Sequence, residues 1–194
     1  MGRPRQFDEE AAVESAMRVF WRKGYGATTP QDLVDELGIG KGSLYNAFGS
    51  KRALFERSLR RYGETRAARL PDILEGPGPV KDRVRAALEL LLETDLADPG
   101  RQGCFAVNTA AELASSDAGA RDEVRRMFAR TEGAFLAALE EGQRAGEIDA
   151  ARDVRALASL LLNTVVGMRV LAKTADGRAQ LERVVDAILD ALQG

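Results

Sequence analysis

The segment from Thr28 to Lys51 constrains the fold of this chain most, because it encodes two short helices joined by a glycine turn. Thr29 is placed to cap the first helix, and Asp32, three residues later, completes a capping box. Gly38 ends that helix, since glycine tolerates the left-handed conformation that follows a helix C-terminus. A second short helix is predicted over residues 41–48. This arrangement is typical of a helix-turn-helix, whose second helix enters the major groove of DNA.

The second helix and the residues after it resemble a motif of the TetR family of transcriptional repressors. Members of that family carry a Lys-Gly-(Ser or Thr)-Leu-Tyr run, followed at fixed spacing by Phe, by Ser or Asn, and by Lys. The matching residues are Lys41, Gly42, Ser43, Leu44, Tyr45, Phe48, Ser50 and Lys51. Two positions depart from the pattern: Gly40 replaces the usual Ser or Thr cap, and Ala47 replaces a Tyr or His that contacts phosphate. The resemblance is specific, although it does not transfer every DNA contact.

The resemblance implies an all-α chain of about nine helices. Residues 1–62 would form the helix-turn-helix domain with the start of a long connecting helix, and residues 63–194 a helical regulatory and dimerisation domain. The implied function is a ligand-responsive regulator that represses by binding operator DNA as a homodimer, with activation as an alternative mode. A small-molecule effector in the core would move the connecting helix, change the spacing of the two DNA-binding domains and release the DNA.

Charge is distributed unevenly along the chain. Residues 1–62 hold eleven Lys and Arg against eight Asp and Glu, whereas residues 63–194 hold seventeen against twenty-two. The net charge of −2 for the whole chain gives no sign of a polyanionic partner, yet the N-terminal third is basic. Cations placed around a helix-turn-helix would neutralise phosphates and release counterions, so we expect DNA binding that weakens with salt.

Residues of three kinds are predicted to contact DNA. Asn46 can read adenine, while Tyr45 and Ser43 more often hold phosphates. Gly42 lets the backbone approach the DNA closely, or alternatively satisfies packing against the first helix. An N-terminal arm would reach an adjacent groove or the backbone. The full set is Arg3, Arg5, Thr28, Gln31, Lys41, Gly42, Ser43, Tyr45, Asn46 and Lys51.

Further helices are predicted on both sides of this motif. Asp8 caps one that ends before Gly24, and Ser50 caps a long one through Arg69, with Pro71 ending that helical region. Five more are predicted at about Val80–Leu96, Cys104–Ala114, Ala118–Ala145, Val154–Thr174 and Arg178–Leu192. No alternation typical of strands and no internal repeat is evident.

The last two predicted helices carry apolar stripes that we interpret as a dimer seam. A DNA-binding domain with one short recognition helix usually needs a second half-site on the DNA, and therefore a second copy of the chain. In such a dimer the last two helices of each copy would form a four-helix interface. The alternative is burial of the same stripes inside the monomer. The predicted interface residues are Leu157, Leu161, Val165, Leu181, Val184, Val185, Ile188 and Leu192.

A small, mostly apolar effector is predicted to bind among three helices of the core. Aromatic and methionine walls with a few polar groups suit such a ligand, although the same residues also suit a plain core. The predicted pocket residues are Cys104, Phe105, Asn108, Glu112, Met127, Phe128, Phe135, Asn163 and Met168.

Cys104 is the only cysteine, so an intrachain disulfide is excluded. The segment from Gly103 to Asn108 resembles a run in TetR relatives that respond to electrophiles or oxidants. A helix N-terminus and the nearby Arg101 would favour the reactive thiolate, which predicts a thiol-sensing role. The alternative is a small buried hydrophobe without a resolving partner.

Composition argues against enzymatic function. There is no histidine and no cysteine cluster, which excludes histidine-based catalysis and common zinc sites, and no cofactor is expected. No leading hydrophobic segment resembles a signal peptide, and the uncharged stretch Ala156–Met168 is shorter than a membrane span, so a cytoplasmic protein without a membrane partner is predicted. A helical assembly module whose basic end serves solubility is the alternative class of function.

Overall fold

The N-terminal helices begin and end where the sequence places capping residues. The Asp8 carboxylate accepts hydrogen bonds from two backbone N–H groups at the start of α1 (Glu9–Lys23). Both halves of the capping box between Thr29 and Asp32 are formed at the start of α2 (Pro30–Leu37). A hydrogen bond from Lys23 and others from Thr29 hold the pKa of Asp32 at about 2. Gly38 ends α2 in the left-handed conformation, at a φ of 63°. The predicted helix-turn-helix is therefore confirmed.

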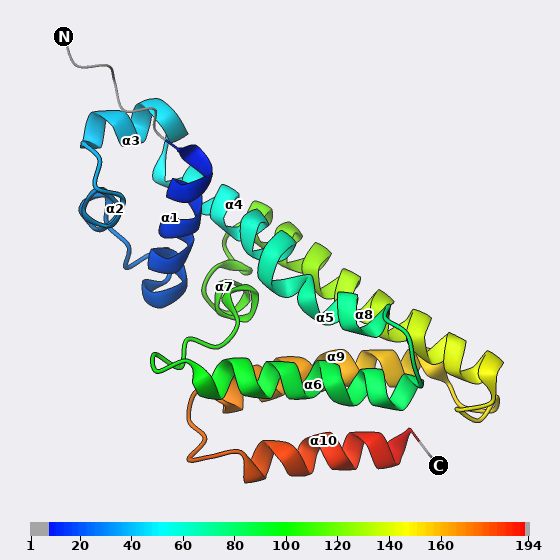
Figure 1. The fold of residues 1–194 in the computed structure, drawn as a ribbon. Helices are drawn as coiled ribbons and strands as arrows, with labels where there is room; N and C mark the ends of the chain where they lie inside the picture. The colour runs from blue at the N-terminus through cyan, green and yellow to red at the C-terminus, as the bar shows by residue number, and fades with distance from the viewer. Residues whose placement is uncertain (1–7, 193–194) are drawn as a thin grey trace.

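The computed structural model describes residues 8–192, and in this range the chain is all-helical (Figure 1). Counting α4, a π-helical turn and α5 as one interrupted helix, the described range contains the nine helices that the sequence predicted. After α2 they are α3 (Lys41–Phe48), α4 (Lys51–Tyr62), the π turn (Gly63–Ala67), α5 (Arg69–Leu74), α6 (Val80–Ala97), α7 (Phe105–Leu113), α8 (Ala118–Ala145), α9 (Val154–Leu171) and α10 (Ala179–Ala191).

The connecting helix differs from the prediction near Pro71. Pro71 does not end the helical region but lies in the first turn of α5, which continues to Leu74. The π turn and Ala68 interrupt the helix just before α5, so the missing N–H of the proline falls where no helical partner is required. The connecting helix therefore consists of α4 and α5 separated by a π turn.

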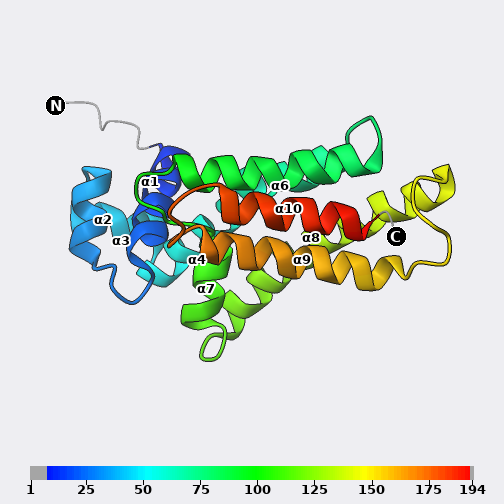
Figure 2. The ribbon, with the colours of Figure 1, turned by 90° about the horizontal axis from the view of Figure 1, so that it is seen from below.

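Two apolar clusters hold the molecule together. One joins α1–α4 to residues of α7 and α8, including Phe105 and Met127, so it crosses position 62, where the two domains were predicted to divide. The other lies among α5, α6, α8, α9 and α10. In Figure 1, α2 and α3 lie at one end, α8 runs from beside α4 to the opposite end, and α6, α9 and α10 extend away from the N-terminal helices. Figure 2 shows α6, α9 and α10 side by side.

The apolar stripe assigned to a dimer seam is mainly buried inside the monomer. Leu157, Leu161, Leu181 and Val185 are at most 7% exposed, and together with Ile188 and Leu192 they belong to the core among α6, α8, α9 and α10. Val165 and Val184 pack against the same core. The prediction identified the apolar faces but not their partner, because α6 lies beside α9 and α10 and covers those faces.

The opposite face of α9 is the apolar surface that remains exposed. Leu160, Val170 and Leu171 are 45%, 47% and 42% exposed. Gly167 lies on the same side, and a Cβ built there would meet nothing within 4 Å. Among the described residues, α9 is the one helix long and apolar enough to cross a membrane by length and composition, with a mean hydropathy of 1.5 over 18 residues. The 18-residue window includes Arg155 and Arg169, which bound the uncharged stretch Ala156–Met168 noted in the sequence.

Candidate functional site

The outer face of α3 carries polar side chains that have no partner in the described part of the chain. Lys41, Ser43 and Asn46 are exposed, and no hydrogen bond or ion pair ties their side chains to residues 8–192. Leu44 and Phe48 lie on the opposite face, 2% and 5% exposed, and fix α3 against the N-terminal core. This arrangement leaves one positive charge and two hydrogen-bonding groups on one surface, as a major-groove contact requires.

Gly42 lies on the exposed part of α3. A Cβ built at Gly42 would meet no atom within 4 Å, so packing against α2 does not require a glycine there. Close approach of another molecule is the explanation that remains of the two considered from the sequence. Gly40 is the N-cap of α3 and makes no side-chain hydrogen bond there, as expected for a glycine in place of the usual Ser or Thr.

The remaining predicted DNA contacts are a mixed group. Thr28 is 1% exposed and its hydroxyl donates a 2.6 Å hydrogen bond to the carbonyl of Gly24, so its side chain is not on the surface. Lys51 donates to the carbonyls of Tyr25 and Thr28, at 2.9 and 2.8 Å, and lies 4.2 Å from the Tyr25 ring centroid. Both residues stabilise the loop before α2. The side chain of Thr28 is therefore not available to DNA, whereas a DNA contact of the half-buried Lys51 stays a prediction.

Of the four remaining predicted positions, two lie on the described helices and two lie outside the described residues. Gln31 is exposed and donates to Asp35 at 2.7 Å. Tyr45 is half-buried on α3. Arg3 and Arg5 lie outside the described residues.

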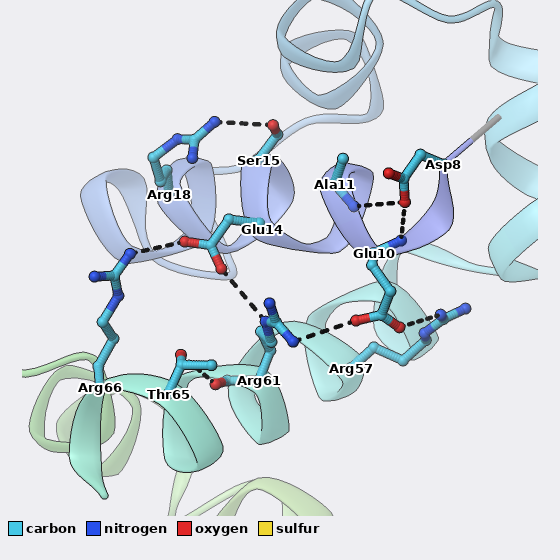
Figure 3. A network of polar contacts seen from close by, with 10 residues as sticks. All are labelled: Asp8, Glu10, Ala11, Glu14, Ser15, Arg18, Arg57, Arg61, Thr65 and Arg66. Atoms are coloured by element: carbon cyan, nitrogen blue, oxygen red, sulfur yellow. Dashed lines mark hydrogen bonds and ion pairs between the residues drawn. The ribbon is translucent and has the colours of Figure 1, made fainter. Parts of the chain in front are cut away.

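Ion pairs join α1 to the connecting helix (Figure 3). Arg57 lies 2.9 Å from Glu9, and Arg61 contacts both Glu10 and Glu14. Arg66, in the π turn, lies 2.9 Å from Glu14. Most of these groups are partly exposed, so each pair contributes little alone, but together they fix the angle between α1 and α4.

Two further contacts attach the N-terminal domain to α7 and α8. The carboxylate of Glu112 accepts hydrogen bonds from the backbone N–H groups of Tyr25, at 3.0 Å, and Gly26, at 2.6 Å. The guanidinium of Arg52 on α4 pairs with Asp117, which also caps α8. The position of the DNA-binding helices therefore depends directly on α7 and on the start of α8.

A cavity of about 160 Å³ lies beside the π turn, among α5, α6, α8 and α9. Its walls are mainly apolar and include Leu70, Leu91, Met127, Phe128 and Val166. The volume is close to the roughly 150 Å³ of an engineered apolar cavity that binds benzene. The cavity therefore has the size and lining for a small apolar group.

A chain of polar groups leads from this cavity toward α6. The hydroxyl of Tyr62 donates a 3.3 Å hydrogen bond to the sulfur of Cys104, and burial raises the pKa of that hydroxyl well above its usual range. Arg169 is 6% exposed and donates to the carbonyl of Gly103 at 2.9 Å. Its Nε lies 3.0 Å from Asp95 without the alignment of a hydrogen bond. Burial raises the pKa of Asp95 to about 6.

The cavity contains three of the nine residues that the sequence assigned to a pocket, namely Cys104, Met127 and Phe128. The other six lie elsewhere. Phe105, Phe135 and Met168 are buried in the two cores. Asn108 donates to the carbonyl of Gln102, Glu112 holds Tyr25 and Gly26, and Asn163 is exposed. The prediction chose one face on each of three helices, whereas the cavity also takes its walls from α1, α4, the π turn, α5 and α6.

The sequence analysis missed several wall residues. Trp21 and Tyr62 line the cavity from α1 and α4, and Arg66 and Arg169 supply charge. Arg169 interrupts an apolar helix, which was the one available signal of a buried functional or structural charge. Arg101, expected beside Cys104, instead donates to the carbonyls of Ala172 and Ala175. Within residues 8–192, no group of three or more acidic or cysteine side chains is arranged to hold a metal ion.

Comparisons with known proteins agree with this geometry. Residues 12–57 match the family described as bacterial regulatory proteins, tetR family, and residues 80–188 match the tetracyclin repressor-like C-terminal domain. The HTH-type transcriptional regulator YezE of Bacillus subtilis is 32% identical over 194 residues, with 99% of this chain and 100% of YezE aligned. The repressor ComR of Escherichia coli is 28% identical over 97% of this chain and 90% of its own length.

Solved structures give the same result. A cysteine mutant of the TetR family regulator CifR, in complex with 26-base-pair operator DNA, superposes with a TM-score of 0.87 at 29% identity, over 98% of this chain and 100% of CifR. The fold, the helix-turn-helix and the family matches over both halves of the chain lead to one conclusion: the chain belongs to the TetR family of transcriptional regulators.

Proposed function

We propose that this regulator is a repressor that binds operator DNA as a homodimer and is released by an effector bound in its core. The observation that carries the proposal is the outer face of α3, where Lys41, Ser43 and Asn46 are exposed, without side-chain partners among the described residues, around an unobstructed Gly42. The likeness to operator-bound CifR and to the repressor ComR supports it. We expect the protein to act in the cytoplasm, with residues 1–62 reading DNA and residues 63–194 serving regulation and dimerisation.

The dimer is proposed to form through the exposed face of α9. Leu160, Val170 and Leu171 are large apolar side chains at helical spacing, and Gly167 between them lets a second helix approach closely. Burying such a face is favourable by roughly 25 cal/mol for each Å² removed from water. A two-fold dimer would present two copies of α3 to successive turns of the major groove.

The effector is proposed to bind in the cavity beside the π turn. That cavity touches Tyr62 at the end of α4 and Leu70 in α5, so an occupant would contact the connecting helix directly. Single π turns inside α-helices are rare and frequently occur at functional sites. Filling the cavity would therefore alter the direction of α4, and with it the spacing of the two recognition helices.

A thiol response through Cys104 is a second proposed route to release. Cys104 is half-buried, lines the cavity and accepts the hydrogen bond of Tyr62. Alkylation of its sulfur would add bulk in the cavity and remove that hydrogen bond. If peroxide or maleimide modifies Cys104, as judged by mass spectrometry, and DNA affinity stays unchanged, this route is excluded.

The decisive experiment is fluorescence anisotropy of the full chain on DNA from upstream of its own gene, across a salt series. Specific repression predicts saturable binding with dimer stoichiometry, tighter than to scrambled DNA and strongly weakened by salt. Equal binding to both DNAs would be followed by selection from a random library. If that selection enriches no sequence, the proposal fails and the assembly module becomes the better reading. Arg144→Ala, which removes a positive charge at the far end of α8, should leave operator affinity unchanged.

A further inference from the structure

A second cavity adjoins the first and differs from it in chemistry. It has a volume of about 270 Å³ and lies between α1, the end of α6 and the loop that follows α6. Trp21, Arg66 and Thr94 line both cavities, so they form a shared wall. We call the two spaces the apolar chamber and the polar chamber. A ligand larger than one chamber could therefore occupy both.

Arginines line the polar chamber from two separate elements. Arg18 and Arg22 come from α1, and Arg66 comes from the π turn. Figure 3 shows Arg18 and Arg66 at the same end of α1. Because α1 belongs to the DNA-binding domain and the π turn to the connecting helix, an anion held here would contact both.

The arginine side chains are only partly neutralised by the protein. Arg18 donates to the hydroxyl of Ser15 at 2.9 Å, and no carboxylate within residues 8–192 lies within ion-pair distance of it. Arg22 lies 3.7 Å from Glu36, across an exposed surface, and Arg66 pairs with Glu14. At least one guanidinium is therefore available to an anionic ligand.

The two carboxylates of the chamber already have partners. Asp95 lies 3.0 Å from Arg169. Asp98 accepts hydrogen bonds from the backbone N–H groups of Gly100, at 3.0 Å, and Gln102, at 2.8 Å. These acids compete little for Arg18, but their own charge would repel a dianion such as a phosphate monoester more than a single carboxylate.

The shared wall contains an unsatisfied donor. The indole nitrogen of Trp21 is buried and has no acceptor among the described residues. A buried N–H without an acceptor is unfavourable, because it has lost its hydrogen bond to water without gaining another. An oxygen brought in by a ligand at the junction of the chambers would satisfy it.

We infer that the effector is a small amphiphilic carboxylate, with its apolar body in the apolar chamber and its carboxylate in the polar chamber beside Arg18. The apolar chamber accepts a group about the size of one phenyl ring. The polar chamber accepts a single negative charge with accompanying water. Such a ligand links the DNA-binding domain to the core through α1, in addition to the contact with α4. The inference depends on the proposed effector response for its regulatory meaning, but not for binding itself.

Binding is tested on the full chain without DNA, by isothermal titration calorimetry. The probes are phenylacetate, 3-phenylpropionate and 4-phenylbutyrate, each compared with the alcohol of the same length. The best carboxylate should bind roughly tenfold more tightly than its alcohol, since a hydrogen bond between charged groups is stronger than one to a neutral hydroxyl. Arg18→Gln should remove that preference and leave the affinity for the alcohol unchanged. Arg18 is exposed, and within residues 8–192 its side chain makes one hydrogen bond, to Ser15, so the substitution should not impair folding.

The matched control is Arg144→Gln, the same change at the far end of α8. The inference is overturned if no carboxylate in the series binds more tightly than its alcohol, or if Arg18→Gln retains the preference. An equal loss in both arginine variants would indicate general electrostatics and would also overturn it. Operator release is measured separately by anisotropy with the best carboxylate. Tight, Arg18-dependent binding without release would support the site while rejecting the proposed effector response.

Discussion

Glu112 on α7 holds Gly26 in the loop before α2, through a 2.6 Å hydrogen bond from the glycine backbone N–H to the carboxylate. The same carboxylate accepts from Tyr25 at 3.0 Å. An acidic side chain of the regulatory region is thereby attached to the DNA-binding domain, 86 residues earlier in the chain. This contact gives α7, whose N-cap is Cys104, a direct connection to the helix-turn-helix.

Glu112→Ala should lower the free energy of unfolding by about 1–2 kcal/mol, because two backbone donors lose a charged acceptor. It should also weaken operator binding, since α2 and α3 lose a fixed position relative to the core. Denaturant unfolding and anisotropy measure the two effects. Glu140→Ala is the control, as Glu140 is exposed on α8 and its carboxylate makes no contact within residues 8–192. If the two variants have the same stability and operator affinity, Glu112 does not hold the DNA-binding helices in position.

Lys41 and Lys51 should respond differently to substitution by alanine, although both belong to the same motif. Lys41→Ala removes an exposed charge without partners, so stability should stay within about 0.5 kcal/mol while the salt dependence of operator binding decreases by about one counterion. Lys51→Ala removes a donor to Tyr25 and Thr28, so it should destabilise the chain by about 1–2 kcal/mol. Thermal unfolding and a salt titration distinguish the two. A stable Lys51→Ala variant with a reduced salt slope would make Lys51 a phosphate contact after all.

Gly42→Ala tests why α3 has a glycine at this position. The added methyl group would meet no atom within 4 Å, and alanine favours the helix by roughly 0.5–1 kcal/mol relative to glycine. Stability should therefore stay equal or rise, while operator affinity falls because the methyl group occupies the space needed by the DNA backbone. Unchanged operator affinity would show that close approach does not explain Gly42.

The sequence predicted helices and caps well because those signals are local. The bounds of α8 match the prediction at both ends, and the capping box at Thr29 is formed. The apolar faces of α9 and α10 were also identified, but a stripe does not specify whether it packs within one chain or between two. The burial of Leu161 and Leu181 depends on the position of α6, which belongs to the tertiary structure and is not encoded in the local pattern.

The candidate site was less predictable because its walls come from many separate elements of the chain. Trp21, Tyr62 and Cys104 meet at the cavity wall although they lie on different elements of the chain. Their sequence positions share no period, so no pattern brings them together. The contacts of Thr28 and Lys51 were not predictable for a related reason: the sequence identifies the residue type, whereas its hydrogen-bond partner depends on the folded loop.

The proposed dimer predicts that charge on the exposed face of α9 produces a monomer. Leu160→Glu combined with Leu171→Glu places two like charges in each copy of the interface, whereas these side chains are 45% and 42% exposed in the monomer. Light scattering should therefore show a monomer of normal helicity, with operator affinity strongly reduced. Ala129→Glu, on an exposed position of α8, should remain dimeric. A double variant that stays dimeric would place the interface elsewhere.

The buried pair of Asp95 and Arg169 predicts how stability depends on pH. Burial raises the pKa of Asp95 from 3.8 to about 6, while Arg169 and Lys173 oppose the shift and Asp98 adds to it. Because the folded chain holds this proton more tightly than the unfolded chain, the contribution of Asp95 to stability is largest below pH 3.8. That contribution decreases as the pH rises through 6.

The Asp95→Asn variant has no titratable group at this position. Comparing it with the natural chain therefore separates the pH effect of Asp95 from that of the other carboxylates. Between pH 4 and pH 6.5, the free energy of unfolding of the natural chain should fall relative to the variant. We expect a difference of about 1–3 kcal/mol, as one pKa unit corresponds to about 1.4 kcal/mol and solvent screening reduces the full value. Denaturant unfolding at several pH values measures this. If the difference in free energy of unfolding between the two chains stays constant with pH, Asp95 remains ionised throughout this range, stabilised by Arg169 despite its burial. The hydrogen bond from Arg169 to the carbonyl of Gly103 would then be equally stable at every pH in the range.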